Sequence, residues 1–149
     1  MIDIPELPAL APAGADRMRA LAETILLDFS HPRVAALVQG RGWQQLTEHG
    51  RIAAAYAFVR DEIAFGYNRD DDLKASEVLA DGYGQCNTKS TLMMALLRAL
   101  GIPCRFHGFT IDKQLQRGAI TGLAYWLAPR NIIHSWVEVW TGERWARLE

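Results

Sequence analysis

The feature of this sequence most suited to chemistry is a cysteine that follows a glycine-containing turn and opens an apolar helix. Segment 81–85 (DGYGQ) leads into Cys86, and polar residues follow it from 87 to 90. The unpaired N–H groups and the dipole at a helix start favour an anion, so a thiolate there is stabilised. The same N–H groups can receive an oxyanion when a thiolate attacks a carbonyl. We therefore predict that Cys86 is a nucleophile.

The other cysteine, Cys104, has apolar neighbours. It follows Ile102 and Pro103, and a free cysteine in such surroundings usually behaves as a small buried hydrophobe. We expect a structural role for Cys104. The first 17 residues carry acids and prolines rather than a basic start and an unbroken apolar stretch, which is unlike a signal peptide. With two cysteines and no export signal, the sequence favours a reduced, cytoplasmic protein.

A thiolate nucleophile needs a base that can also protonate the leaving group, and histidine is the usual one. The sequence contains four histidines: His31, His49, His107 and His134. The first two fall in a turn and near a helix start, where surface positions are expected. His107 and His134 both fall on predicted strands, and strict alternation places His134 on one face with Trp136. A histidine beside tryptophans is often a packed core residue, so periodicity leaves the base undecided between His107 and His134.

The elements that must position these residues are helices first and strands last. Apolar spacing predicts helices from about 17 to the His31–Pro32 step, over 47–63, over 74–79 and over 86–100. It predicts strands over 102–111, 131–140 and 144–148, the last two joined by a turn at 141–143. Residues 113–130 fit either a helix or a long loop. This order indicates an α+β fold.

The helix after Cys86 is apolar nearly all round, so it must be enclosed in the middle of a domain. The late strands alternate apolar and polar residues, and such strands cover one face of a core as an antiparallel sheet. We expect the Cys86 helix to pack on that sheet, with the earlier helices around it. Residues 1–16 are predicted to form an extended N-terminal arm, because of their prolines, and 17–149 a single domain.

Composition excludes several classes of partner. The chain has 149 residues, is 50% hydrophobic and has a formal net charge of -1, which is typical of one globular domain. This balance argues against nucleic acid or an anionic membrane surface recognised by bulk charge. The acidic run 70–72 lacks the ligand spacing of a calcium loop, and no cysteines or histidines have zinc-ligand spacing. We expect neither a metal nor another cofactor, and the oligomeric state stays open.

Three ordered blocks carry a family resemblance: YGQCNTKSTLMMALLRALGIPCRFHGFTI, HSWVEVW and GERWARLE. Together they resemble the catalytic core of the transglutaminase-like superfamily, which has a papain-like architecture, over about residues 63–149. In that family a cysteine opens the central helix, a histidine heads an H-x-W-x-E-V strand, and an aspartate lies four positions after a later tryptophan, where this chain departs from the pattern with Glu149. The resemblance implies a triad of Cys86, His134 and Glu149, with Glu149 following Trp145, and it selects His134 over His107.

The resemblance implies cysteine-dependent hydrolysis or acyl transfer at an amide or peptide carbonyl. Cys86 attacks, His134 protonates the departing amine, and water or an amine resolves the acyl-enzyme. Gln85 is a candidate oxyanion donor by analogy with papain-like enzymes, and Tyr83 and Trp136 are candidates for an acyl-binding groove, with core packing as the alternative for Trp136. The expected substrate is an amide-containing peptide or protein.

Departures from the family pattern keep alternatives open. Protein-crosslinking transglutaminases carry a tryptophan directly after the cysteine, where this chain has Asn87, and they are longer. Glu149 is the last residue given, so Asp112 is an alternative acid, as is a continuation of the natural chain. The alternative function is a non-catalytic binding or scaffolding domain of the same fold, and a weaker one is a dedicated acyltransferase.

Overall fold

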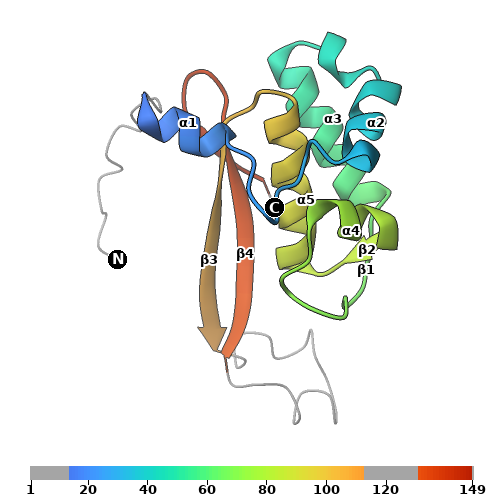
Figure 1. Cartoon of the computed structure of the whole chain (residues 1–149). Coiled ribbons are helices and arrows are strands. Elements are labelled where there is room, and N and C mark those ends of the chain that lie inside the picture. The colour runs from blue at the N-terminus through green and yellow to red at the C-terminus, as the bar shows by residue number, and fades with distance from the viewer. Residues whose placement is uncertain (1–13, 113–130, 149) are drawn as a thin grey trace, which may run out of the picture.

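A computed structural model describes residues 14–112 and 131–148. The middle helices lie on one side and a long β-hairpin on the other, with the cysteine-bearing helix between them, and the first helix contacts the hairpin (Figure 1). The elements are α1 (Ala15–Leu21), α2 (Pro32–Gly40), a 3₁₀ turn at Trp43–Gln45, α3 (Glu48–Asp61), β1 (Ala64–Phe65), α4 (Ala75–Asp81), β2 (Tyr83–Gly84), α5 (Cys86–Ala99), β3 (Cys104–Asp112), β4 (Asn131–Trp140) and β5 (Trp145–Leu148).

Helix α5 forms the centre of the hydrophobic core. Leu92, Leu96 and Leu97 are fully buried, and the helix packs against α3 and α4 on one side and β3 and β4 on the other. A helix with apolar residues on all sides can be stable in water only when it is enclosed in this way. The prediction of a buried helix that begins at Cys86 is therefore confirmed.

The sheet that covers α5 is antiparallel and has the order β3-β4-β5. Val137 pairs with Phe106 and Val139 with Cys104, and Val137, Val139 and Cys104 are buried on the face toward the core. The opposite face carries the polar pair Arg105–Glu138 together with Trp136, Trp140 and Trp145, of which Trp140 is buried. The observed sheet confirms the predicted fold class, an α+β core with the cysteine-bearing helix packed on an antiparallel sheet.

Two features of the first half differ from the sequence prediction. Helix α1 ends at Leu21, whereas apolar spacing predicted a helix up to Pro32. Side chains between them bond to the backbone instead: the Ser30 amide donates to the Glu23 carboxylate and the Leu27 amide to the Thr24 hydroxyl. Such local bonds compete with helix formation. A helix then begins at Pro32, because proline is well suited to the first position of a helix.

The second feature is a small parallel pairing that the sequence did not indicate. β1 pairs with β2, with Ala64 opposite Tyr83 and Phe65 opposite Gly84. Strands of two residues have no detectable periodicity. The pair joins the end of α3 to the turn before α5, which is the turn that positions Cys86.

Several expectations fall on residues outside the described part of the chain. These are most of the arm 1–16, the ambiguous segment 113–130 and the terminal residue Glu149. Helix α1 begins at Ala15, inside the predicted arm. Among the described helices, each is too short or too polar to cross a membrane.

Candidate active site

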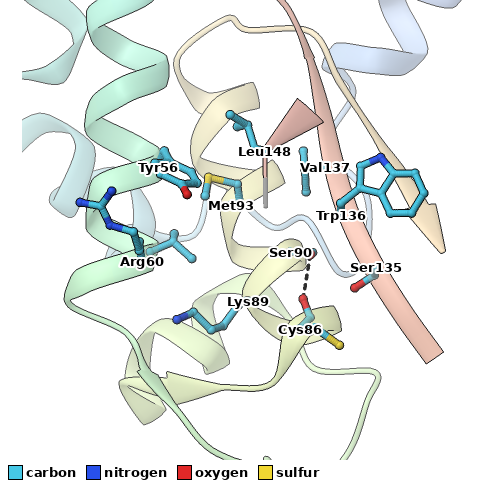
Figure 2. A pocket seen from close by; sticks show the side chains of 11 residues that line it. Tyr56, Arg60, Cys86, Lys89, Ser90, Met93, Ser135, Trp136, Val137 and Leu148 are labelled. Carbon is cyan, nitrogen blue, oxygen red and sulfur yellow. Dashed lines mark hydrogen bonds between the residues drawn. The ribbon is translucent and has the colours of Figure 1, made fainter. Parts of the chain in front are cut away.

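Cys86 is the first residue of α5 and is partly exposed. Its thiol points into the space between the start of α5 and strand β4 (Figure 2). The turn before it depends on glycine at two positions. Gly82 has a φ of 72°, and a Cβ on Gly84 would lie 2.6 Å from the Thr88 hydroxyl. The chain can therefore approach the helix start closely enough to place Cys86 there.

A network of polar side chains fixes the start of α5. The Thr88 hydroxyl accepts from the Gln85 amide at 3.1 Å and donates to the Asn68 side-chain oxygen at 2.7 Å. The Asn68 side-chain amide donates to Asp81 and to the Tyr83 carbonyl, both at 3.0 Å. The loop that contains Asn68 is thus bonded to the turn on both sides of Gly84.

Asp71 extends this network to the residues on each side of Cys86. Its carboxylate accepts from the Gln85 side-chain amide at 2.7 Å and from the Asn87 side-chain amide at 2.9 Å. These bonds, first that from Asn87 and then that from Gln85, lower the pKa of Asp71. The spacing of the acidic run 70–72 excluded a calcium loop, but sequence reasoning missed this role, because nothing local indicates that the loop returns to α5.

Gln85 is therefore a buried part of the turn. Its side-chain N–H bonds to Asp71, and its side-chain oxygen accepts from the Asn68 backbone amide at 2.9 Å. In this arrangement the Gln85 amide group is directed at the loop. Tyr83 lies against Gly66 with 38% of its surface exposed. Neither residue lines the groove beside Cys86.

That groove has a volume of about 240 Å³ and lies between α3, α5, β4 and β5 (Figure 2). Its lining consists of Tyr56, Val59, Arg60, Cys86, Lys89, Ser90, Met93, Ser135, Trp136, Val137 and Leu148. Cys86 lies at one end, where the Ser90 hydroxyl donates to its carbonyl at 2.7 Å. The groove gives a substrate access to the thiol from a largely apolar surface.

His134 lies on β4, where its backbone is paired with Phe109. Its neighbour Ser135 is buried and lines the groove together with Cys86. The side chain of His134 is outside the described part of the structure, as are the side chain of Asp112 and all of Glu149. Leu148, the residue before Glu149, pairs with Val137 on β4. The triad of Cys86, His134 and Glu149 stays a prediction.

His107, the other candidate base, occupies the polar face of the sheet. Its Nε2 lies 2.9 Å from the Glu138 carboxylate, and its ring stacks on Trp136 with centroids 5.4 Å apart. Burial raises the pKa of Glu138, but Arg105 and His107 outweigh it and leave that pKa lowered. His107 does not line the groove. The Trp136 indole points away from the groove (Figure 2). Arg147 lies 4.4 Å from the centre of its ring.

Cys104 has the burial that its apolar neighbours predicted. It is fully buried, with its sulfur 3.7 Å from the Met94 carbonyl oxygen. Burial raises the pKa of the Cys104 thiol to about 11, although Arg98 opposes this. Cys104 is thus a neutral thiol at neutral pH. Within 14–112 and 131–148, no three histidine, cysteine or acidic side chains gather closely enough to hold a metal ion.

Comparison with solved structures shows the same fold in two bacterial proteins. A protein of Cytophaga hutchinsonii, provisionally described as a cysteine protease, has a TM-score of 0.68 at 15% identity, covering 97% of this chain and 45% of its own. The periplasmic domain of TgpA from Pseudomonas aeruginosa has a TM-score of 0.56 at 18% identity, covering 89% of this chain and 46% of its own. That domain is periplasmic, so it gives no support to the expected cytoplasmic location.

Comparison by sequence adds one curated relative and a family. The uncharacterized protein YebA of Bacillus subtilis is 31% identical over 97 residues, which are 64% of this chain and 13% of YebA. The chain thus spans a small part of YebA and less than half of the two solved chains. The family model of the transglutaminase-like superfamily matches residues 31–149, which extends the resemblance from the core into the earlier helices. The chain therefore belongs to the transglutaminase-like superfamily.

Proposed function

We propose that this domain hydrolyses an amide or peptide bond, or transfers its acyl group to an amine, through a covalent intermediate on Cys86. The observation that carries the proposal is the position of the thiol. Cys86 opens a buried helix, faces β4 and lines an open groove. A thiolate nucleophile also needs a base, and in this proposal the base is His134, which lies on β4.

The reaction follows from these positions. The Cys86 thiolate attacks the carbonyl carbon, and backbone N–H groups at the start of α5 stabilise the oxyanion. The intermediate collapses with cleavage of the C–N bond, while protonated His134 gives its proton to the departing amine. Water, deprotonated by His134, then attacks the thioester and releases a carboxylic acid and the thiol. An amine in place of water gives acyl transfer. Glu149 accepts the second imidazole N–H and orients the ring.

Acylation of the protein by p-nitrophenyl acetate tests the proposal. We expect intact-protein mass spectrometry to find one acetyl group on the wild-type chain and none on Cys86→Ala, with Cys104→Ala as the matched control that still reacts. His134→Ala should prevent both acylation and turnover, and Glu149→Gln should impair them less, since orientation of the ring is only partly lost. A larger loss in Asp112→Asn than in Glu149→Gln would assign the acid to Asp112. A folded chain that acquires no acetyl group is a non-catalytic domain of this family.

A further inference from the structure

The groove beside Cys86 continues well beyond the thiol. Met93 follows Cys86 by seven positions on α5, so with a rise of 1.5 Å per residue the groove extends over roughly 10 Å of helix. Val59, Val137 and Leu148 form its apolar walls, from α3, β4 and β5. An apolar surface of this length beside a nucleophile has the form of a subsite for one part of the substrate.

The volume of the groove limits the size of the substrate group that it can bind. A dry cavity of about 150 Å³ accepts a benzene ring, and sites for drug-sized ligands begin at about 300 Å³. The groove, at about 240 Å³, lies between these values. It therefore has room for one aliphatic side chain with some of its backbone.

Ser135 provides a polar contact inside the groove. The residue is only 7% exposed, and its buried hydroxyl has no hydrogen-bond partner among the described residues. Figure 2 shows this hydroxyl directed from β4 toward Cys86. A buried hydroxyl without a partner is costly, and a substrate amide bound next to the thiol would supply the missing partner.

The charged residues that line the groove favour some substrate side chains over others. Arg60 and Lys89 lie on its lining, which contains no acidic side chain among the described residues. Arg60 is paired with Asp61, and the Lys89 ammonium donates to the Ile63 carbonyl at 2.7 Å. Burial lowers the pKa of Lys89. Because Asp61 offsets the charge of Arg60, Lys89 leaves this lining with a net positive charge, so a basic substrate side chain is disfavoured.

We propose that this groove binds the residue on the acyl side of the scissile amide, that this residue has an uncharged aliphatic side chain of about the size of leucine, and that the Ser135 hydroxyl hydrogen-bonds its backbone amide. The assignment to the acyl side rests on the proposed function, because it places the carbonyl at Cys86. The substrates are then peptides or amides with a leucine-like acyl residue. Ser135 acts as a specificity residue, and the sequence pattern around His134 gave no sign of this role.

Binding can be measured without catalysis by NMR of the full chain with ¹³C-methyl methionine, because Met93 lines the groove and its neighbour Met94 does not. We expect N-acetyl-leucinamide to shift the Met93 methyl signal saturably and the Met94 signal little. Full burial of a leucine side chain favours binding by about tenfold or more, so N-acetyl-glycinamide and N-acetyl-lysinamide should bind at least tenfold more weakly. Ser135→Ala should weaken the binding of N-acetyl-leucinamide several-fold. Ser30→Ala, a matched change on the exposed surface, should have no effect on this binding.

A second measurement connects the groove to acylation. Cys86 should be acylated at least tenfold faster by the thioester of N-acetyl-leucine than by that of N-acetyl-glycine, and Ser135→Ala should reduce this ratio. Equal binding of the three amides, or no shift of Met93 with any of them, would overturn the proposal. If only the proposed function is wrong, the result is different. The Met93 methyl signal would still shift on binding of N-acetyl-leucinamide, but no acyl-enzyme would form. Equal acylation rates with the two thioesters would contradict the proposed specificity of the groove but would still support Cys86 as the nucleophile.

Discussion

The two cysteines of this domain lie in surroundings that differ in almost every physical respect. Cys104 is enclosed by the core, with Val139 opposite it on β4 and the Met94 carbonyl against its sulfur. Cys86 lies at the start of α5, between Gln85 and Asn87, whose side-chain amides both donate to the Asp71 carboxylate. Packing determines the position of the Cys104 thiol, and directional polar contacts determine that of the Cys86 thiol.

This difference shows how a small domain can present a reactive group. Packing alone would bury the thiol and favour its neutral form, as happens at Cys104. A network of hydrogen bonds holds the backbone as firmly while leaving the thiol at the edge of the core. Asn68 and Thr88 therefore do at the start of α5 what apolar side chains do along the rest of the helix.

The largest expected effect is the difference in reactivity between the two thiols. At pH 7.5 a thiol with a pKa of about 11 has only about one thiolate in several thousand molecules, and Cys104 is also inaccessible. We expect brief treatment with iodoacetamide to modify Cys86 at least a hundredfold faster, as measured by peptide mass spectrometry. Labelling of Cys104 should rise as the pH increases toward 11, because its raised pKa keeps the thiol neutral below that range. Equal labelling of Cys86 and Cys104 at pH 7.5 would contradict the expected difference in reactivity.

Replacement of Gly84 by alanine should have the next largest effect. The new Cβ would lie 2.6 Å from the Thr88 hydroxyl, which is itself bonded to Asn68, so the start of α5 must shift. We expect a loss of about 1–3 kcal/mol in the free energy of unfolding and loss of acylation at Cys86. Gly40→Ala is the matched control, since nothing lies within 4 Å of its Cβ position. Urea unfolding and the acylation assay measure the two effects, and a Gly84→Ala chain as stable as the control would contradict this account of the turn.

Loss of the Asp71 carboxylate should have a moderate effect. Asp71→Ala removes the acceptor of both the Gln85 and the Asn87 side-chain amides, and we expect slower acylation with a loss of about 1 kcal/mol of stability, since the site is exposed. Asp72→Ala is the matched control. Because the folded pKa of Asp71 is lowered, its contribution is present at neutral pH and is lost as the pH falls through that folded pKa. Stability of the wild type and of Asp71→Ala should therefore converge in acid, and a constant difference down to the lowest pH would count against this linkage.

The smallest effect on activity is expected from Cys104→Ala. The change removes one sulfur from a closely packed site and should reduce stability by about 1 kcal/mol. Acylation of Cys86 should proceed at the wild-type rate, because no described hydrogen bond connects Cys104 to the start of α5. A large loss of acylation in a variant that remains folded would mean that the two ends of α5 are coupled.

The sequence predicted the parts of this fold that carry strong periodicity. Helix α5 and strand β4 were located to within a residue, since an apolar helix and an alternating strand leave few alternatives. Pro32 was misinterpreted because proline is compatible with both the end and the start of a helix. The β1–β2 pair was missed because two residues carry no period.

The sequence predicted those residues of the candidate site whose role can be inferred from their neighbours in the chain. Cys86 stood out through its polar neighbours and the glycines before it, and the groove beside it agrees with that interpretation. Asp71 and Ser135 were missed for a common reason: each acts through a contact between segments far apart in the chain. Neither an acidic run nor a serine within a strand indicates which distant segment it faces.

The β1–β2 pair also has a consequence for the order in which the domain opens on heating. Short backbone ladders join the turn before Cys86 to the segment after α3, through the bonds from Ala64 N–H to the Gly82 carbonyl and from Gly66 N–H to the Gly84 carbonyl. Such small units exchange their amide protons through local openings that leave the rest of the fold intact. The Cys86 turn is therefore expected to exchange before the leucines of α5, and heat inactivation should precede global unfolding.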